Sequence, residues 1–150
     1  MKIEYHNLYS HIILVTRNRY PFIKEEHRQR IEKYMTGVVS NHLSRVYAIY
    51  ANSEHVHVLI SRSPAISEQE LAARLAAASA KFIVETGLAD SRFAWQESAS
   101  AFSVSKSDVD KVCKYILNQE AHHRKVTFQE EYNAFMKFYQ QTLRYDTHTI

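Results

Sequence analysis

The chain has 150 residues, of which 45% are hydrophobic, and its formal net charge is +3. This length and composition predict one compact domain over residues 1–150 and exclude a disordered chain. With only 2 Gly and 2 Pro, a Gly-rich phosphate loop and a Pro-rich linker are also excluded. The single cysteine, Cys113, excludes an internal disulfide, and we expect it to be a packing residue. No signal-peptide core or membrane-length apolar run is present, so we expect a cytoplasmic protein without a membrane partner.

Hydrophobic periodicity predicts the elements of the first half of the chain. Residues 8–16 are apolar and β-branched, which is typical of a strand, and a turn follows at 17–21. Residues 24–43 have the periodicity of a helix with one apolar face. Two further strands, 44–51 and 54–62, are joined by a tight turn at Asn52 and Ser53, so we expect an antiparallel hairpin.

The second half begins with a break at Ser63-Pro64. Ser67 and Glu70 match a capping box, which predicts a helix that continues to about Thr86 and ends at Gly87. An extended segment lies within 94–104. Ser107 is the expected N-cap of a helix over 108–123, and a second amphipathic helix is predicted over 127–143, with an apolar side of Phe128, Tyr132, Phe135 and Phe138-Tyr139.

The order strand, helix, strand, strand, helix, strand predicts an α+β fold of the ferredoxin-like, or RRM-like, βαββαβ type. Its antiparallel core would span about residues 5–105, with helices on one face and extra C-terminal helices within 107–143. The other face would be open for a ligand or a second subunit. RNA-recognition modules and nicking enzymes share this layout, so the fold alone does not settle function.

The most informative motif is His55-Val56-His57 in the second strand of the hairpin. Residues two apart on a strand point to the same face, so two imidazoles project together from an apolar element and could hold a metal ion. The chain has 9 His, so about half an occurrence of His-x-His is expected by chance. The alternative is one exposed and one hydrogen-bonded histidine.

A second pair, Tyr115 and Gln119, is spaced four residues apart within the helix predicted over 108–123. This spacing places both side chains on one helical face. With 10 Tyr in the chain, this spacing also arises readily by chance, and the alternative is a packed tyrosine beside a solvated glutamine.

In combination, these segments resemble the single-tyrosine HUH transposases of the insertion sequence 200/605 family. The resemblance covers nearly the whole chain. It is carried by Leu8–His11, Thr16–Arg19, Glu54–Ile60, Trp95-Gln96, Ala101–Ser105, Tyr115–Gln119 and His122-His123, in this order. Two segments differ from the usual family pattern: Ser98-Ala99-Ser100 replaces Gly-Tyr-Gly, and Ala76–Lys81 replaces a more polar run.

The resemblance implies a transposase that cuts and rejoins single-stranded DNA, with Tyr115 as the nucleophile of a 5′-phosphotyrosine intermediate. It implies a divalent metal, Mg²⁺ or Mn²⁺, held by His55, His57 and Gln119. It also implies a homodimer that acts on DNA hairpin ends of a mobile element. A domesticated relative that processes palindromic repeat DNA is an alternative within this class.

Several basic residues are candidates for contact with DNA. Arg17 and Arg19 end the first strand, Lys81 lies on the second helix, and His122, His123 and Arg124 follow the tyrosine motif. Each could equally be a solvated charge. For Trp95 and Phe102, core packing is favoured over stacking on bases.

A function from another class is a non-catalytic RRM-like nucleic-acid-binding module. Such a module stacks bases on sheet aromatics and needs no metal. The histidines at 55 and 57 stand where aromatic residues would be expected, which argues against it.

Overall fold

The computed structural model describes residues 1–134 and 137. It consists of two compact units, Met1–Leu117 and Asn118–Ile150. The expectation of one domain over residues 1–150 stays a prediction.

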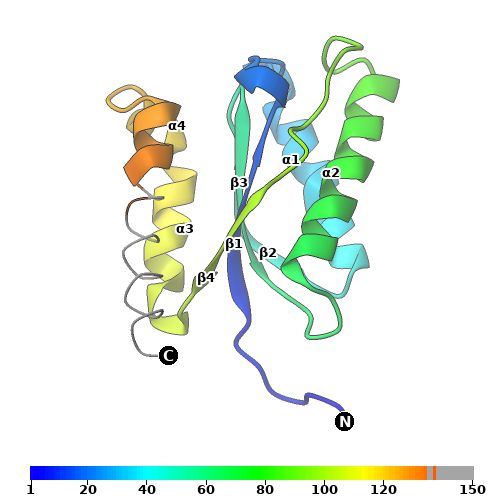
Figure 1. Ribbon diagram of the computed structural model, residues 1–150, viewed down its shortest axis with the longest axis vertical. Helices are drawn as coiled ribbons and strands as arrows, with labels where there is room; N and C mark the ends of the chain where they lie inside the picture. The colour runs from blue at the N-terminus through cyan, green and yellow to red at the C-terminus, as the bar shows by residue number, and fades with distance from the viewer. Residues whose placement is uncertain (135–136, 138–150) are drawn as a thin grey trace. The chain divides into compact units, whose positions relative to one another are not determined.

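The first unit is built on a four-stranded antiparallel sheet in the order β2-β3-β1-β4 (Figure 1). The strands are β1 (Tyr9–Val15), β2 (Arg45–Ala51), β3 (His55–Ser61) and β4 (Ser100–Val104). Strands β3 and β1 are central, so both edges of each are paired. This topology confirms the predicted ferredoxin-like fold and the β2-β3 hairpin.

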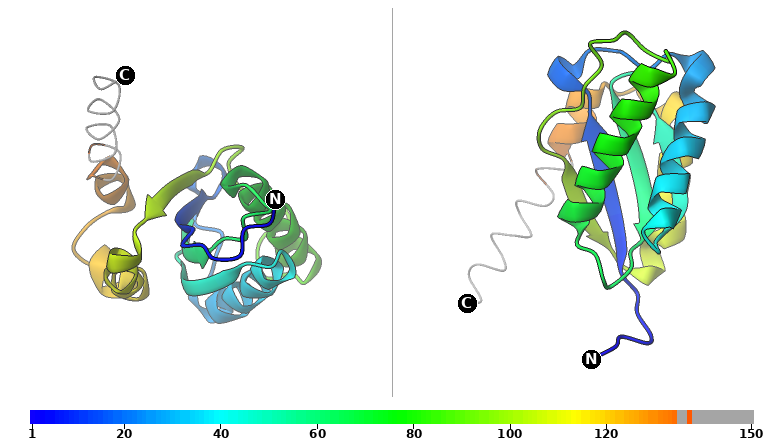
Figure 2. Two further views of the ribbon diagram at one scale, coloured as in Figure 1. Left: turned by 90° about the horizontal axis from the view of Figure 1, so that it is seen from below. Right: turned by 90° about the vertical axis from the view of Figure 1, so that its right-hand side faces the viewer.

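Two helices, α1 (Arg28–Asn41) and α2 (Glu68–Glu85), lie side by side on one face of the sheet (Figure 2). Strand alternation explains why they pack there. Every second residue of β1 and β3 is apolar and enters the core beneath these helices, and the apolar faces of the helices complete it. The buried residues are Ile12 and Leu14 of β1, Val56, Val58 and Ile60 of β3, Ile31 and Met35 of α1, and Leu71 and Leu75 of α2.

The ends of α2 agree with the sequence signals. The Ser67 hydroxyl accepts a hydrogen bond from the backbone N–H of Glu70, as the capping box predicts. After the helix, Gly87 has a φ of +67°, the left-handed conformation that favours glycine. Helix α1 is preceded by a 3-10 turn, η2 (Glu25–His27), within the range predicted for one helix.

The face opposite α1 and α2 is not open as expected. Helix α3 (Val109–Leu117) packs on it over β2 and β3 (Figure 1). A small apolar cluster joins them, formed by Val109 and Ile116 of α3 with Ala48, Tyr50 and Leu59 of the sheet. The amphipathic periodicity of α3 permits this packing, but periodicity does not specify which surface a helix covers.

The start of α3 also differs from the prediction. Ser107 is not its N-cap, because it lies inside a 3-10 turn, η3 (Lys106–Asp108). Ser105 precedes this turn, and its hydroxyl donates to the carboxylate of Asp108 at 3.0 Å. The extended residue before the turn is therefore Ser105, two positions earlier than expected.

The expected single helix over 108–123 is wrong. Helix α3 ends at Leu117, Asn118 has a non-helical φ of −98° and ψ of 20°, and α4 (Gln119–His123) begins the second unit. Tyr115 and Gln119 therefore belong to different helices, and the expectation that both side chains lie on one face stays a prediction.

Within the second unit, residues 128–134 are helical, in agreement with the predicted C-terminal helix. Thr127 caps this segment by accepting a hydrogen bond from the backbone N–H of Glu130. Phe128 and Tyr132 of the expected aromatic side lie in the described helix, with ring centroids 5.8 Å apart. Phe135 and Phe138-Tyr139 lie outside the described residues. Throughout the described part of the chain, every helix is too short or too polar to span a membrane.

Candidate metal and nucleophile site

The histidines of β3 lie on the α3 side of the sheet. His55, His57 and Leu59 alternate with the core residues Val56 and Val58, so they point away from α1 and α2. The two imidazoles are buried and meet edge to face, with ring centroids 5.0 Å apart. The expectation that both histidines share one face of the strand is confirmed, and the alternative of one exposed histidine is wrong.

A third histidine joins this pair from the neighbouring strand. His11 of β1 stands opposite Leu59 in the antiparallel register, so its side chain emerges on the same face. Its Nε2 atom lies 2.9 Å from Nδ1 of His57, a buried hydrogen bond between two imidazoles. His11 belongs to a segment that resembles the transposase family, but nothing in the sequence assigned it a role.

The other β3 imidazole has partners in the hairpin turn. Nδ1 of His55 lies 2.8 Å from Oε1 of Glu54, and Nε2 lies 3.1 Å from the amide nitrogen of Asn52. The turn itself is fixed, because the carbonyl of Glu54 accepts hydrogen bonds from the backbone N–H and the hydroxyl of Thr16. The position of His55 is thus set by its own turn and by the end of β1.

Tyr115 approaches the same face from α3. Its ring meets the His57 imidazole at 87°, with the two centroids 5.8 Å apart. The structure thus brings Tyr115 together with His57 inside the first unit of one chain. Cys113, also on α3, packs against the apolar cluster, and burial raises the pKa of its thiol, with a smaller contribution from Asp110. This environment fits the expected packing role.

Arg17 and Arg19 lie at the end of the sheet where the histidine strand begins. In the register of β1 and β3, Val15 pairs with His55, and the arginines follow immediately in a 3-10 turn, η1 (Arg17–Arg19). Both arginine side chains are exposed. Asn18 and Arg19 have positive φ values of 57° and 55°, which are uncommon for residues other than glycine. A basic turn therefore lies at the end of the sheet where β1 finishes and β3 begins, next to His55.

Lys81 is not brought to this face. It is exposed on α2, which covers the opposite side of the sheet. Nearby, the indole N–H of Trp95 donates to the Ser79 hydroxyl at 3.0 Å, and both residues are buried. The expectation that Trp95 is a core residue is confirmed.

Both departures from the family pattern border one groove of about 650 Å³ beside α2. Ala76 of α2 and Ser98–Ser100 before β4 lie among its lining residues, together with the carboxylates Glu68 and Glu97. Carboxylates repel phosphates, so this groove is a poorer candidate for DNA contact than the basic turn at Arg17 and Arg19.

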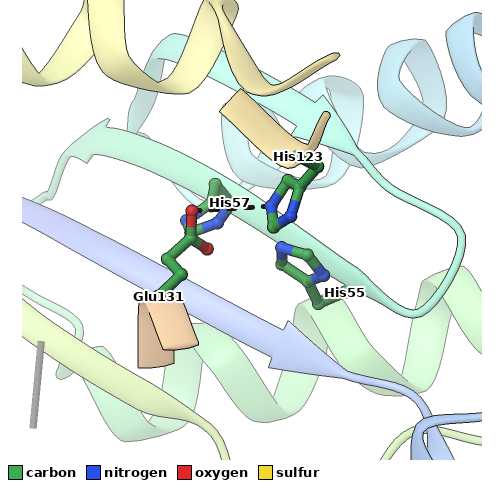
Figure 3. A group of neighbouring side chains, drawn as sticks. All are labelled: His55, His57, His123 and Glu131. Carbon is green, nitrogen blue, oxygen red and sulfur yellow. Dashed lines mark ion pairs between the residues drawn. The ribbon is translucent and has the colours of Figure 1, made fainter. Parts of the chain in front are cut away.

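The second unit contains a polar cluster of its own, formed by Gln119, His122, His123 and Glu131. Nε2 of His123 lies 2.9 Å from Oε1 of Gln119, and the Gln119 amide nitrogen lies 3.5 Å from Oε2 of Glu131. The same carboxylate oxygen is 2.9 Å from Nε2 of His122. Figure 3 shows the ion pair of His123 with Glu131, as well as the two imidazoles of β3.

This cluster sets the orientation of the Gln119 side chain. Its amide donates toward Glu131 and its oxygen faces His123. Sequence reasoning missed Glu131, because the residue lies within a segment whose aromatic stripe predicted only packing. Arg124, in contrast, forms an ion pair with Glu120 at 2.8 Å.

The donor types suit a divalent cation. Imidazole nitrogens are accepted by Mn²⁺ and other transition metals, and amide oxygens suit Mg²⁺ and Mn²⁺. These donor types are compatible with either metal.

Comparison with known proteins gives matches at the level of family and fold. The family model described as "Transposase IS200 like" matches residues 4–119. A putative transposase from Deinococcus radiodurans R1 has a similar structure, with a TM-score of 0.62 and 19% identity, covering 79% of this chain and 96% of that one. A REP-associated tyrosine transposase bound to a REP hairpin has a TM-score of 0.61 and 14% identity, covering 84% of this chain and 74% of that one. No curated protein matches the sequence.

Proposed function

Because the chain belongs to the IS200-like transposases, we propose that it cleaves and rejoins single-stranded DNA through a 5′-phosphotyrosine on Tyr115. The contact between Tyr115 and His57 supports this role most directly, since it places a hydroxyl-bearing side chain beside a candidate metal ligand. In the first step, the tyrosine oxygen bonds to phosphorus and the P–O3′ bond breaks. The tyrosine gives up its proton and the leaving oxygen gains one.

The reverse chemistry completes the exchange. A 3′-hydroxyl from a second strand attacks the phosphotyrosine, forms a new phosphodiester and releases Tyr115. The energy of the broken phosphodiester is conserved in the covalent link, so no nucleotide cofactor is needed. The reference pKa of tyrosine is about 10, so the hydroxyl requires activation at neutral pH.

The proposed ligands of a divalent metal are His55, His57 and Gln119. When bound, Mg²⁺ or Mn²⁺ would polarise the scissile phosphate and stabilise charge on the leaving oxygen. The surrounding residues of the protein orient these three side chains. Gln119 comes either from the same chain or from the second copy in a homodimer, which is the proposed assembly.

The proposed partner is single-stranded DNA with hairpin ends. Arg17 and Arg19 provide exposed cations at the His55 end of the sheet, and His122, His123, Arg124 and Lys81 stay secondary candidates for DNA contact. The structural neighbour that binds a REP hairpin supports including palindromic repeat DNA among the substrates to be tested. A cytoplasmic location stays a prediction.

The alternative of an RRM-like binding module is less well supported. Helix α3 covers β2 and β3 on the face where such a module would stack bases. On that face the central strands present His11, His55 and His57, and the aromatic residues Tyr50 and Phe102 stand on the outer strands β2 and β4.

The decisive experiment uses Tyr115→Phe. Single-stranded oligonucleotides from the flanks of the gene, with or without a hairpin and labelled at the 3′ end, are incubated with protein and Mn²⁺. The unsubstituted chain should form a denaturation-resistant adduct with the label, and Tyr115→Phe should form none while still binding DNA and Mn²⁺. Tyr5→Phe, at a residue 87% exposed, is the matched control and should keep the adduct. An adduct of normal yield with Tyr115→Phe would refute the assignment.

A further inference from the structure

Each histidine of the β3 pair has a hydrogen-bonding partner at its Nδ1 atom. We propose that these partners, His11 and Glu54, are positioning residues that fix both imidazoles in the tautomer with the proton on Nδ1. Both histidines then present Nε2 as the ligand atom. This inference deepens the proposed function and rests on the metal site proposed there.

For His55 the direction of the hydrogen bond follows from its partner. The Glu54 carboxylate only accepts when ionised, so the Nδ1 atom 2.8 Å away carries the proton. The second contact agrees with this assignment. The Asn52 amide nitrogen, 3.1 Å from Nε2, is a donor, so Nε2 must be the unprotonated acceptor. Metal binding at Nε2 would replace the Asn52 contact and leave the Glu54 contact intact.

The Glu54 side chain is itself held in place. Its Oε2 atom accepts a hydrogen bond from the Ser53 hydroxyl at 2.8 Å, and its backbone carbonyl is bound by Thr16. Because both the carboxylate and the backbone of Glu54 are held, the carboxylate orients the His55 ring that it contacts. Such carboxylate–histidine–metal arrangements raise the basicity of the ligand and fix its rotation.

For His57 the partner is another imidazole, so two proton assignments exist. Nε2 of His11 and Nδ1 of His57 are 2.9 Å apart and share one proton. If His11 carried it, neutral His57 would be protonated on Nε2, and neither nitrogen could offer a lone pair to a metal. Ligation therefore requires His57 to donate from Nδ1, with His11 accepting and carrying its own proton on Nδ1.

His11 is well placed for this task. It sits on the central strand β1, and its ring packs against Phe102 of β4 with centroids 6.4 Å apart and planes at 66°. Neighbours on both sides limit its rotation. The anionic Glu54 carboxylate and the neutral His11 imidazole would thus orient the Nε2 atoms of His55 and His57 before a metal binds.

The first test reads the tautomers directly. Nitrogen-15 NMR of the metal-free full chain, at a pH where imidazoles are neutral, should show both β3 histidines protonated on Nδ1 and unprotonated on Nε2. In His11→Phe, His57 should change to a mixture of tautomers while His55 stays unchanged. Protonation of His57 on Nε2 in the unsubstituted chain would overturn the proposal, whatever the activity.

The second test measures Mn²⁺ affinity by calorimetry and electron paramagnetic resonance. His11→Phe should weaken binding about 10–100-fold, the usual effect of removing an outer hydrogen-bonding partner. His11→Gln should restore most of it, because its terminal amide can accept the same hydrogen bond. Glu54→Ala should weaken binding in the same range, and Glu54→Gln, which keeps an acceptor oxygen, should weaken it less. His6→Phe, at an exposed position, is the control.

The outcomes separate the two levels of the proposal. No Mn²⁺ binding by the unsubstituted chain would overturn the metal site and this inference together. Normal binding by the unsubstituted chain, by His11→Phe and by Glu54→Ala would overturn this inference alone. Failure of His11→Gln to recover affinity, with native circular dichroism, would also count against it, since a positioning role requires the hydrogen bond.

Discussion

The ring of Tyr115 stands edge-on to the imidazole of His57, with centroids 5.8 Å apart and planes at 87°. The two residues are far apart in the sequence, so the contact depends on how α3 docks on the sheet. The neighbouring residue, Ile116, is fully buried against Leu59 and Val109 in the apolar cluster beneath α3. The position of the candidate nucleophile is therefore linked to the packing of Ile116.

Ile116→Ala should destabilise the first unit and lower adduct formation together. Truncating a buried isoleucine costs about 2–5 kcal/mol, because apolar contacts are lost and a cavity remains. Urea unfolding should report this loss, and adduct yield should fall even under conditions where the variant is folded. Leu117→Ala is the matched control, since Leu117 is 61% exposed and should change stability by less than about 0.5 kcal/mol. Equal effects of the two variants would contradict the docking argument.

Ser79→Ala should destabilise the core beneath α2 by about 1–3 kcal/mol, because it leaves the buried indole N–H of Trp95 without its acceptor. The chain contains 1 Trp, so fluorescence-detected unfolding reports the environment of this residue alone. Ser98→Ala, at an exposed serine, is the control and should have no effect. Unchanged stability of Ser79→Ala would mean that the indole finds another acceptor.

Leu43→Gly should stabilise the protein by about 1 kcal/mol, although it removes a large apolar side chain. Leu43 follows α1 with a φ of +56° and is 83% exposed. Its N–H donates to the Ser40 carbonyl and that of Ser44 donates to Val39, the Schellman pattern in which glycine is favoured. Relief of left-handed strain exceeds the loss of exposed apolar contact. Thermal unfolding checks this, and Leu43→Ala, which keeps the strain, should show no gain.

Glu68→Gln should lower stability at neutral pH and have no effect at strongly acidic pH. The pKa of Glu68 is held below its ordinary value of 4.5 by its own backbone N–H, by Arg62 and by the Ser10 hydroxyl. Because the folded-state pKa is depressed, the stabilisation is present above the unfolded-state pKa. It is lost as the pH falls through the folded-state pKa. The urea unfolding midpoints of Glu68→Gln and of the unsubstituted chain, measured across this pH range, should converge only at low pH. Glu97→Gln, at an exposed residue, provides the baseline.

Arg17→Gln and Arg19→Gln should each weaken binding of single-stranded DNA and reduce its salt dependence. Each phosphate contact contributes about 0.7 to the slope of log affinity against log salt for a single strand. Fluorescence anisotropy at several salt concentrations measures both quantities. Arg74→Gln, on the exposed side of α2, should leave the slope unchanged. An unchanged slope in the first two variants would exclude the basic turn from the DNA path.

The sequence by itself determined the strands, most helices and the shared face of His55 and His57. These features depend on neighbours along the chain: strand alternation, helical periodicity, the Ser67 cap and Gly87 at a left-handed position. The resemblance to the transposase family added Tyr115 and Gln119 as candidates. The single helix predicted to carry both residues is interrupted at Asn118. Residue spacing alone cannot detect where a helix ends when the sequence has no strong stop signal there.

Only the tertiary structure decided which partners these residues have. His11 meets His57 through the register of β1 against β3, and Tyr115 meets it through the docking of α3 on a face that was expected to be open. Such contacts arise from many weak packing interactions between distant segments, which leave no periodic trace in the sequence. The sequence therefore determined which chemical groups are present, and the packing determined which nitrogen of each imidazole is held.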